Sequence, residues 1–141
     1  MPATLKRLTC VLLIALALIA LSGCSADPVS LDGTQWTLAE WSVSSLSPND
    51  FQITADFADG RISGKSAVNS YGGEYTLGPG DAFSTGPLVT TLMAGPEPAM
   101  RAEQAYTVLL AAARSYKLAG DRLTLYDEGG NESLIFEAVT F

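Results

Sequence analysis

The sequence has no histidine, and its 8 lysine and arginine residues are outnumbered by 15 aspartate and glutamate residues. The absence of histidine excludes Ser-His and Cys-His catalysis, zinc sites that need an imidazole ligand, and the usual acid–base group of near-neutral pH. The excess of acidic residues gives a formal net charge of −7, which repels the phosphates of nucleic acids. We therefore expect neither a histidine-dependent hydrolase nor a partner made of nucleic acid.

The N-terminus has the features of a secretory signal peptide. Lys6 and Arg7 precede an apolar run of about a dozen residues, and the small residues before Cys24 provide a cleavage site. The tetrapeptide at positions 21–24, Leu-Ser-Gly-Cys, matches the bacterial lipobox. In that pattern the cysteine carries a lipid, such as diacylglycerol or palmitate, and the chain is cut before the cysteine. We therefore predict that Cys24 is the lipid attachment site.

The signal peptide sets the predicted boundaries of the chain. Residues 1–23 are predicted to be the lipoprotein signal peptide, and residues 24–30 the lipidated N-terminus and tether. An uncleaved transmembrane helix is the alternative. It is disfavoured because the uncharged residues 8–26 barely suffice to span a bilayer, and Gly23 and Pro28 would break the helix.

Cleavage before Cys24 changes the chemistry that remains. It removes Cys10 and leaves the sulfur of Cys24 occupied by lipid, so we expect no disulfide, thiolate nucleophile or metal site in the folded domain, and no cofactor. Lys6 and Arg7 leave with the signal peptide, so the net charge becomes 6 − 15 = −9. Such a surface is repelled by anionic headgroups. We therefore expect an exported protein that only its acyl chains anchor to the cell membrane, or to the outer membrane of a cell that has one.

Residues 31–141 are predicted to form one domain built mainly of short strands. Alternating apolar and polar residues between glycine-containing turns predict strands over 34–42, 52–58, 61–66, 74–77, 82–85, 116–119, 123–126 and 133–139. Asp59 and Gly60 form a typical hairpin turn. The predicted core consists of Trp36, Leu38, Ile53, Phe57, Ile62, Tyr75, Leu109, Leu110, Leu123, Leu125 and Phe136.

One segment departs from the strand pattern. From Ala99 to Ala113, apolar residues recur at helical spacing, and Pro96, Glu97 and Pro98 suit the start of a helix. Short antiparallel strands with a single helix cannot make a parallel, doubly wound sheet. We therefore predict an α+β, mostly β fold, in which one packed α-helix covers a curved antiparallel sheet or open barrel of 7–8 short strands.

Five short motifs follow one another in a recognisable order. They are LDGTQWTL at 31–38, DGRISG at 59–64, VNSYGGEY at 68–75, TTLMAGP at 90–96 and LTLYD at 123–127. Together they resemble the META/HslJ family of bacterial domains, which envelope lipoproteins often carry. The resemblance covers residues 31–136 and implies a compact antiparallel β fold with one packed helix. It also implies a role in stress response, drug tolerance or envelope integrity, with no established enzymatic reaction.

The chain departs from the family pattern at two positions. The family usually has a cysteine immediately before the asparagine of the third motif and another just before the proline of the fourth. Val68 and Gly95 stand at these positions here, so the link that family members can form between the two segments is absent.

The segment 69–75 contains the candidate binding residues Asn69, Tyr71, Glu74 and Tyr75. Asn69 can simply stabilise a bend between strands, because asparagine tolerates left-handed backbone and bonds nearby amides. The two tyrosines, with Glu74 between them, can equally line the mouth of a pocket or contact a partner. Both interpretations stay open. No catalytic residue and no metal ligand are predicted.

Three functions are compatible with these observations. The first is a non-catalytic, membrane-anchored envelope lipoprotein whose domain binds an envelope protein, a peptide or a hydrophobic ligand, or serves stress or drug tolerance. The second is a hydrolase of envelope glycans that uses two carboxylates. The third is a pilotin-like carrier of a hydrophobic ligand or peptide, suggested by the likeness of the META fold to pilotin lipoproteins. The first is favoured, because most of the acidic residues stand beside Gly, Pro or Asn, largely in predicted turns.

Overall fold

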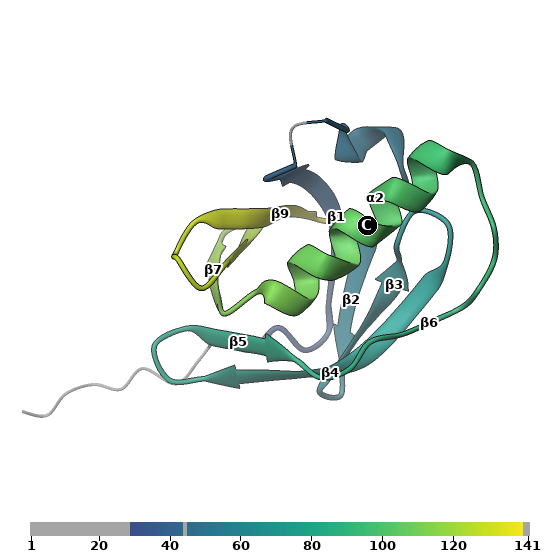
Figure 1. Cartoon of the computed structure of the whole chain (residues 1–141). Coiled ribbons are helices and arrows are strands. Elements are labelled where there is room, and N and C mark those ends of the chain that lie inside the picture. The colour runs from purple at the N-terminus through teal and green to yellow at the C-terminus, as the bar shows by residue number, and fades with distance from the viewer. Residues whose placement is uncertain (1–28, 44, 140–141) are drawn as a thin grey trace, which may run out of the picture.

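The strands of this chain close into a barrel, and its helix α2 lies across one end of that barrel (Figure 1). The computed structural model describes residues 29–43 and 45–139. The predicted signal peptide, Cys24 and most of the predicted tether therefore lie outside the described residues. In chain order the elements are β1 (Thr34–Trp41), the 3-10 helix η1 (Pro48–Asp50), β2 (Thr54–Ala58), β3 (Arg61–Lys65), β4 (Ser70–Gly78), β5 (Ala82–Thr85), β6 (Val89–Thr90), α2 (Glu97–Ala112), β7 (Ser115–Ala119), β8 (Arg122–Tyr126) and β9 (Glu132–Ala138).

The sheet is antiparallel throughout the described residues. Eight strands follow the order β3-β2-β1-β9-β8-β7-β5-β4, and β4 pairs back onto β3, which closes the barrel. The two-residue strand β6 adds to the edge of β4. The predicted mostly β fold with one packed helix is confirmed. We expected a curved sheet or an open barrel, and the observed sheet closes on itself. It closes because β4 is longer than the predicted strand 74–77 and its first half pairs with β3.

The interior of the barrel is filled by the inward-facing side chains of its strands. Nine of the eleven predicted core residues are buried, and Tyr75 and Leu109 are partly buried and pack against the others. This agreement shows that the predicted inward-facing residues of the strands are largely correct. The core also contains large side chains that were not predicted, namely Leu31, Tyr71, Phe83, Tyr106, Tyr116 and Leu134.

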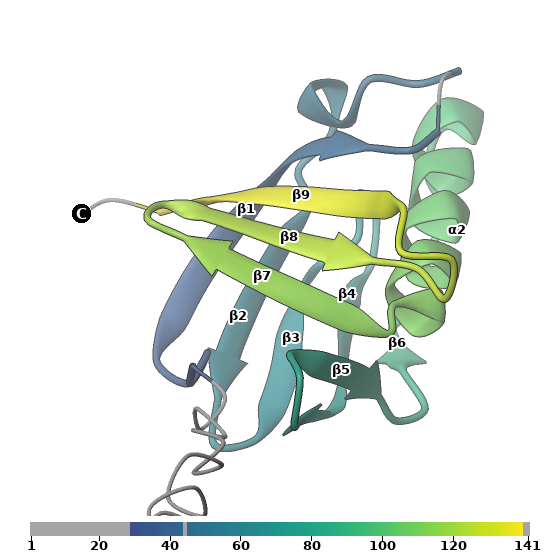
Figure 2. The same cartoon turned by 90° about the vertical axis from the view of Figure 1, so that its left-hand side faces the viewer.

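Helix α2 covers the end of the barrel where β1 finishes and β2 begins (Figure 2). It starts at Glu97 with a proline in its first turn, as the sequence predicts. The helix buries Ala102, Tyr106 and Leu110. The Tyr106 ring packs edge-on against Phe136, with 6.4 Å between the ring centroids. Helix α2 therefore closes this end of the barrel, which we call the helix end.

The pairing of β5 with β7 is the weakest seam of the barrel. Ala82 and Ser115 are the only register pair of the two strands, flanked by two backbone hydrogen bonds of 2.9 Å. Beyond this point the wall is completed by residues 29–33. The Tyr116 hydroxyl donates to the Val29 carbonyl oxygen at 2.8 Å, and Leu31 is fully buried. The chain therefore enters the domain at the end opposite α2, which we call the open end (Figure 2).

Candidate functional site

The four residues predicted as binding candidates do not gather at one place. Asn69, just before β4, and Tyr71 are buried at the helix end, with exposed fractions of 2% and 4%. Glu74 is exposed on the outer face of β4. Tyr75 lies toward the open end, where its hydroxyl donates to Asp32 Oδ1 at 2.6 Å. A shared binding role for these four residues stays a prediction.

The Glu103 carboxylate on α2 binds the bend before β4. Its Oε2 atom accepts hydrogen bonds from Ser66 Oγ at 2.9 Å, from the Val68 amide at 3.3 Å and from the Asn69 amide at 2.7 Å. Its Oε1 atom accepts from Asn69 Nδ2 at 2.7 Å. Burial alone would raise the pKa of this carboxyl, but these hydrogen bonds outweigh it and hold the pKa below its usual value. The carboxylate is thus a fixed acceptor that ties the helix to the barrel.

The Asn69 side chain extends this arrangement to the segment after β6. Its Oδ1 atom accepts from Thr91 Oγ1 at 2.8 Å and from the Met93 amide at 2.7 Å, and its Nδ2 atom donates to the Met93 carbonyl oxygen at 3.1 Å. We call Ser66, Val68, Asn69, Thr91, Met93 and Glu103 the Asn69–Glu103 network. Every polar atom of the Asn69 side chain has a partner in it, so the network joins three segments and offers no free group to a ligand.

Tyr71 is held in the same way. Its hydroxyl donates to the Thr54 carbonyl oxygen at 2.9 Å and lies 2.6 Å from the Tyr106 hydroxyl, which is therefore the donor of the second bond. The two rings meet edge-on at 5.4 Å. Burial raises the pKa of both hydroxyls, so both stay protonated at neutral pH. The pair fills the barrel interior below α2 and has no surface to present to a partner.

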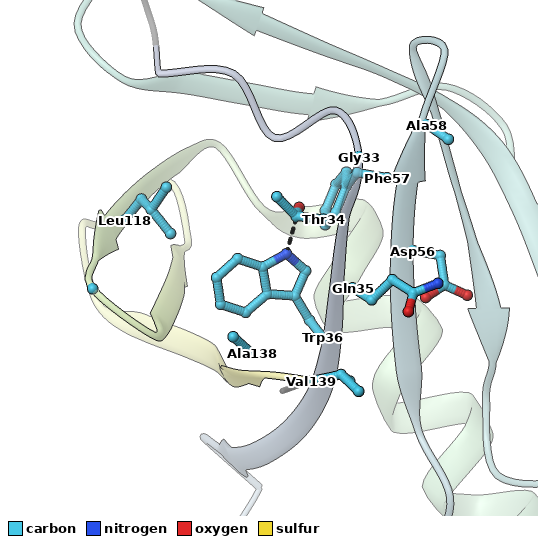
Figure 3. Close-up of a pocket in the computed structure, with 11 residues that line it drawn as sticks. Gly33, Thr34, Gln35, Trp36, Asp56, Phe57, Ala58, Leu118, Ala138 and Val139 are labelled. Carbon is cyan, nitrogen blue, oxygen red and sulfur yellow. Dashed lines mark hydrogen bonds between the residues drawn. The ribbon is translucent and has the colours of Figure 1, made fainter. Parts of the chain in front are cut away.

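At the open end, a cavity of about 470 Å³ reaches the barrel interior, whereas the depressions of about 380 Å³ beside α2 are lined by surface residues of the helix such as Arg101 and Gln104. The cavity is lined by Gly33, Thr34, Gln35, Trp36, Asp56, Phe57, Ala58, Leu118, Gly120, Ala138 and Val139, from β1, β2, β7, β9 and the turns beside them. Figure 3 shows the Trp36 indole between β1 and the strands that carry Leu118 and Ala138. A volume of this size is typical of small-molecule sites. We call this space the open-end cavity.

Carbon atoms form most of the open-end cavity, and the polar atoms beside Trp36 are already bonded. Trp36 Nε1 donates to Thr34 Oγ1 at 2.7 Å, and Thr34 Oγ1 donates to the Leu31 carbonyl oxygen at 2.5 Å. The indole therefore presents only its ring to the cavity. At the rim, Gly33 adopts a φ of 81°, and a β-carbon built on it would meet no atom within 4 Å. The cavity is thus open to solvent beside Gly33.

Carboxylate chemistry finds little support in the structure. Among the described residues, hydrogen bonds lower the pKa of Glu103 and that of Asp127, with those from Asn131 as the main cause at Asp127. A glycan hydrolase needs a carboxyl whose pKa is raised. Within residues 29–43 and 45–139, no cluster of three acidic, histidine or cysteine residues is placed to hold a metal ion. No helix among the described residues is long and apolar enough to cross a membrane.

Comparison with known proteins identifies the fold. The chain is similar to a protein from Burkholderia xenovorans solved by NMR, with 26% identity and a TM-score of 0.65 over 82% of this chain and 92% of that chain. It shares its fold with a DUF4847 family protein from Bacteroides vulgatus, at 13% identity and a TM-score of 0.56 over 76% of this chain and 93% of that chain. None of the curated proteins matches the sequence.

A sequence model described as the META domain matches residues 29–140. The match spans both ends of the barrel, from the segment that completes its wall to the end of β9, and agrees with the resemblance inferred from the five motifs. This chain belongs to the META domain family.

Proposed function

We propose that this protein is a non-catalytic, lipid-anchored envelope protein that binds an apolar ligand in the open-end cavity. The cavity itself is the observation that carries the proposal: about 470 Å³ of space whose lining includes the apolar side chains of Trp36, Phe57, Leu118 and Ala138. Uncovered apolar surface inside a pocket gains free energy when a ligand excludes water from it, by roughly 25 cal/mol per Å². A contribution to stress or drug tolerance would follow if the ligand is a harmful amphiphile.

The position of the cavity supports the anchored part of the proposal. Residues 29–33 complete the barrel wall at the open end, and Tyr116 holds Val29 there by its hydroxyl. Val29 follows the predicted attachment site Cys24 by five positions, a reach of at most about 18 Å. A lipid on Cys24 would therefore keep the open end, and not the helix end, close to the membrane surface.

The anchor is tested by the substitution Cys24→Ser. Because the thiol of Cys24 is the expected acceptor, we predict that this variant is not lipidated and that it stays uncleaved or leaves the membrane fraction. Mass spectrometry of the wild-type protein should show a chain that begins at Cys24 and carries a diacylglycerol adduct. An unmodified Cys24 in the mature wild-type protein would disprove the anchor and leave the cavity proposal standing.

Ligand binding is tested by filling the cavity. The core closes entirely within residues 31–136, so residues 25–141 contain the complete domain for this experiment. We expect the uncharged fluorescent probe N-phenyl-1-naphthylamine to bind saturably with a stoichiometry near one. Ala138→Leu, which puts a larger side chain into the cavity, should weaken this binding at least tenfold. Ala119→Leu is the matched control, because Ala119 is exposed on the neighbouring hairpin and does not line the cavity.

The two variants separate the proposal from its alternatives. Equal probe binding by wild type, Ala138→Leu and Ala119→Leu would place the probe elsewhere and refute the open-end cavity as the site. Circular dichroism at the same temperature should show both variants folded. If the cavity instead binds a peptide, as in a pilotin-like carrier, that peptide should displace the probe from the wild type and from Ala119→Leu. It should have no such effect on Ala138→Leu.

A further inference from the structure

We propose that the open-end cavity selects cationic amphiphiles, which place an apolar body against Trp36 and a positively charged head at the rim near Asp56. The inference rests on the proposed function, since it assigns the charge class of the ligand to the same cavity. Dodecyltrimethylammonium represents this class, and dodecanoate represents the anionic amphiphiles that the cavity should disfavour.

The lining has a single ionisable side chain, and it is acidic. Of the eleven residues around the cavity, only Asp56 carries a charge, and none is lysine or arginine. Asp56 is half-buried on β2, and among the described residues its carboxylate takes part in no ion pair. An anionic head would meet this charge without a compensating base, whereas a cationic head would gain an attraction that partial burial strengthens.

The nearest arginines point elsewhere. The Arg122 guanidinium, at the turn beside Gly120, contacts Glu40 Oε1 at 3.1 Å. Arg61, across the β2–β3 turn, lies over β4, where its Nη2 atom is 4.0 Å from the position that a β-carbon on Gly72 would occupy. Neither side chain lines the cavity. Among the described residues, no basic side chain therefore forms an ion pair with Asp56.

Two further aspartates at the open end, Asp59 and Asp32, add negative charge near the cavity. Asp59 stands in the β2–β3 turn next to the lining residue Ala58, and Asp32 precedes Gly33. Asp32 Oδ1 already accepts from the Tyr75 hydroxyl and from the Gly60 amide at 3.2 Å, which fixes its charge in place. The charge of Asp56 also reaches the barrel interior, where it adds to the effect of burial in raising the pKa of Tyr71 and Tyr106.

The geometry of the rim allows one ligand to use both parts of the site. In Figure 3 the Trp36 indole lies on one side of β1, and the side chains of Gln35 and Asp56 lie on the other. The edge between them begins at Gly33, which has no side chain and open space around it. Strand β1 is paired with β2 along this stretch, but its pairing with β9 begins only at Trp36. A ligand can therefore cross β1 on the β9 side of Gly33 and Thr34, with its body beside the indole ring and its head beside Asp56.

A series of amphiphiles with one tail and different heads tests the inference. Dodecyltrimethylammonium, dodecylphosphocholine and dodecanoate, each below its micelle concentration, would compete with N-phenyl-1-naphthylamine for residues 25–141 at low ionic strength. We expect the cationic compound to bind at least tenfold more tightly than dodecanoate, with the zwitterion between them. The preference should shrink as salt is added, because the charges at the rim are partly exposed.

Asp56→Asn identifies the origin of the preference. This variant should weaken dodecyltrimethylammonium binding about three- to tenfold, leave dodecylphosphocholine unchanged and strengthen dodecanoate binding. Asp50→Asn is the matched control, since Asp50 lies in η1 at the helix end and should change none of the three affinities. An equal loss in both variants would mean that only the net charge of the protein matters, and the inference would be wrong.

The remaining outcomes are distinguishable. If all three amphiphiles bind wild type with the same affinity and Ala138→Leu abolishes binding, the cavity is a ligand site without charge selection, so the inference fails and the proposed function stands. If neither the probe nor any amphiphile binds, both the proposed function and the inference are overturned.

Discussion

The two ends of the barrel differ in how completely their side chains are packed and hydrogen-bonded. At the helix end, Tyr106 enters the barrel from α2 and bonds Tyr71, and Glu103 and Asn69 use all the polar atoms of their side chains. At the open end, Trp36 and Leu118 border a cavity of about 470 Å³. The barrel interior is filled and bonded at the helix end, whereas at the open end a cavity with several apolar lining residues reaches it.

This difference separates stability from function within one small fold. Buried hydrogen bonds and close packing stabilise a fold most when they are complete, as they are at the helix end. A ligand can gain binding free energy only where packing is incomplete, as it is at the open end. We therefore expect substitutions at the helix end to lower the free energy of unfolding, and substitutions at the open end to change binding.

The largest effect is expected for Tyr106→Ala. Tyr106 is fully buried, contacts Tyr71 and Phe136, and attaches α2 to the barrel. Its truncation should lower the free energy of unfolding by about 3–5 kcal/mol, measured by urea denaturation. Tyr106→Phe keeps the ring and loses only the hydroxyl, so it should cost about 1–2 kcal/mol. Equal losses in the two variants would show that the hydroxyl pair, and not the packing of the ring, holds the helix.

Asn69→Ala should have the next largest effect. The substitution removes the acceptor of the Met93 amide and the donor to Glu103 Oε1, and leaves these groups with unmade hydrogen bonds. We expect a loss of about 2–3 kcal/mol in the free energy of unfolding. Asn49→Ala, at an exposed position in η1, is the matched control and should change it by less than about 0.5 kcal/mol. A cost near zero for Asn69→Ala would mean that water replaces the network.

Much of the helix end was predictable as secondary structure but not as a set of contacts. The spacing of Ala102, Tyr106 and Leu110 gives the buried face of α2 correctly. The bonds of Glu103 to Asn69 join residues 34 positions apart, and their formation depends on the closure of β4 onto β3. No local pattern encodes such a pair, so Asn69 was assigned only to a bend or a binding segment.

The open-end cavity was not predictable at all, because it consists of what the side chains fail to fill. Its small residues Gly33, Gly120 and Ala138 come from three distant parts of the sequence and meet only in the closed barrel. Tyr75 also shows that a local sequence pattern does not determine which strands pair. Alternation placed it in the core, but the second half of β4 leaves β3 to pair with β5, so Tyr75 is only partly buried.

The contribution of Glu103 should depend on pH. Its pKa is lowered in the folded protein, so its carboxylate form adds stability that is complete above the usual carboxyl pKa near 4.5 and is lost as the pH falls through the lower folded value. Glu103→Gln should therefore cost about 1–2 kcal/mol at pH 7 and much less at pH 3. Thermal unfolding at both values measures this.

The control for this experiment is Glu97→Gln on the same helix, where the side chain is 83% exposed and its ion pair with Arg101 spans 3.9 Å. It should leave the pH dependence of wild type unaltered. If the stability of Glu103→Gln depends on pH in the same way as that of wild type, the negative charge of Glu103 does not stabilise the folded protein.

The smallest effect on stability is expected for Ala138→Leu at the open end, compared with the same change at the helix end. Ala102 is fully buried under α2, so three added carbon atoms must displace packed neighbours, and Ala102→Leu should cost about 1–3 kcal/mol. Ala138 lines the open-end cavity, where the added carbons find room near Trp36. We expect Ala138→Leu to change the free energy of unfolding by less than about 1 kcal/mol, and any gain would come from apolar surface removed from water.

Urea denaturation of both variants compares the two ends directly. A loss at Ala138 as large as that at Ala102 would mean that the open end is already filled, and the contrast between the ends, with the ligand site that depends on it, would have to be abandoned.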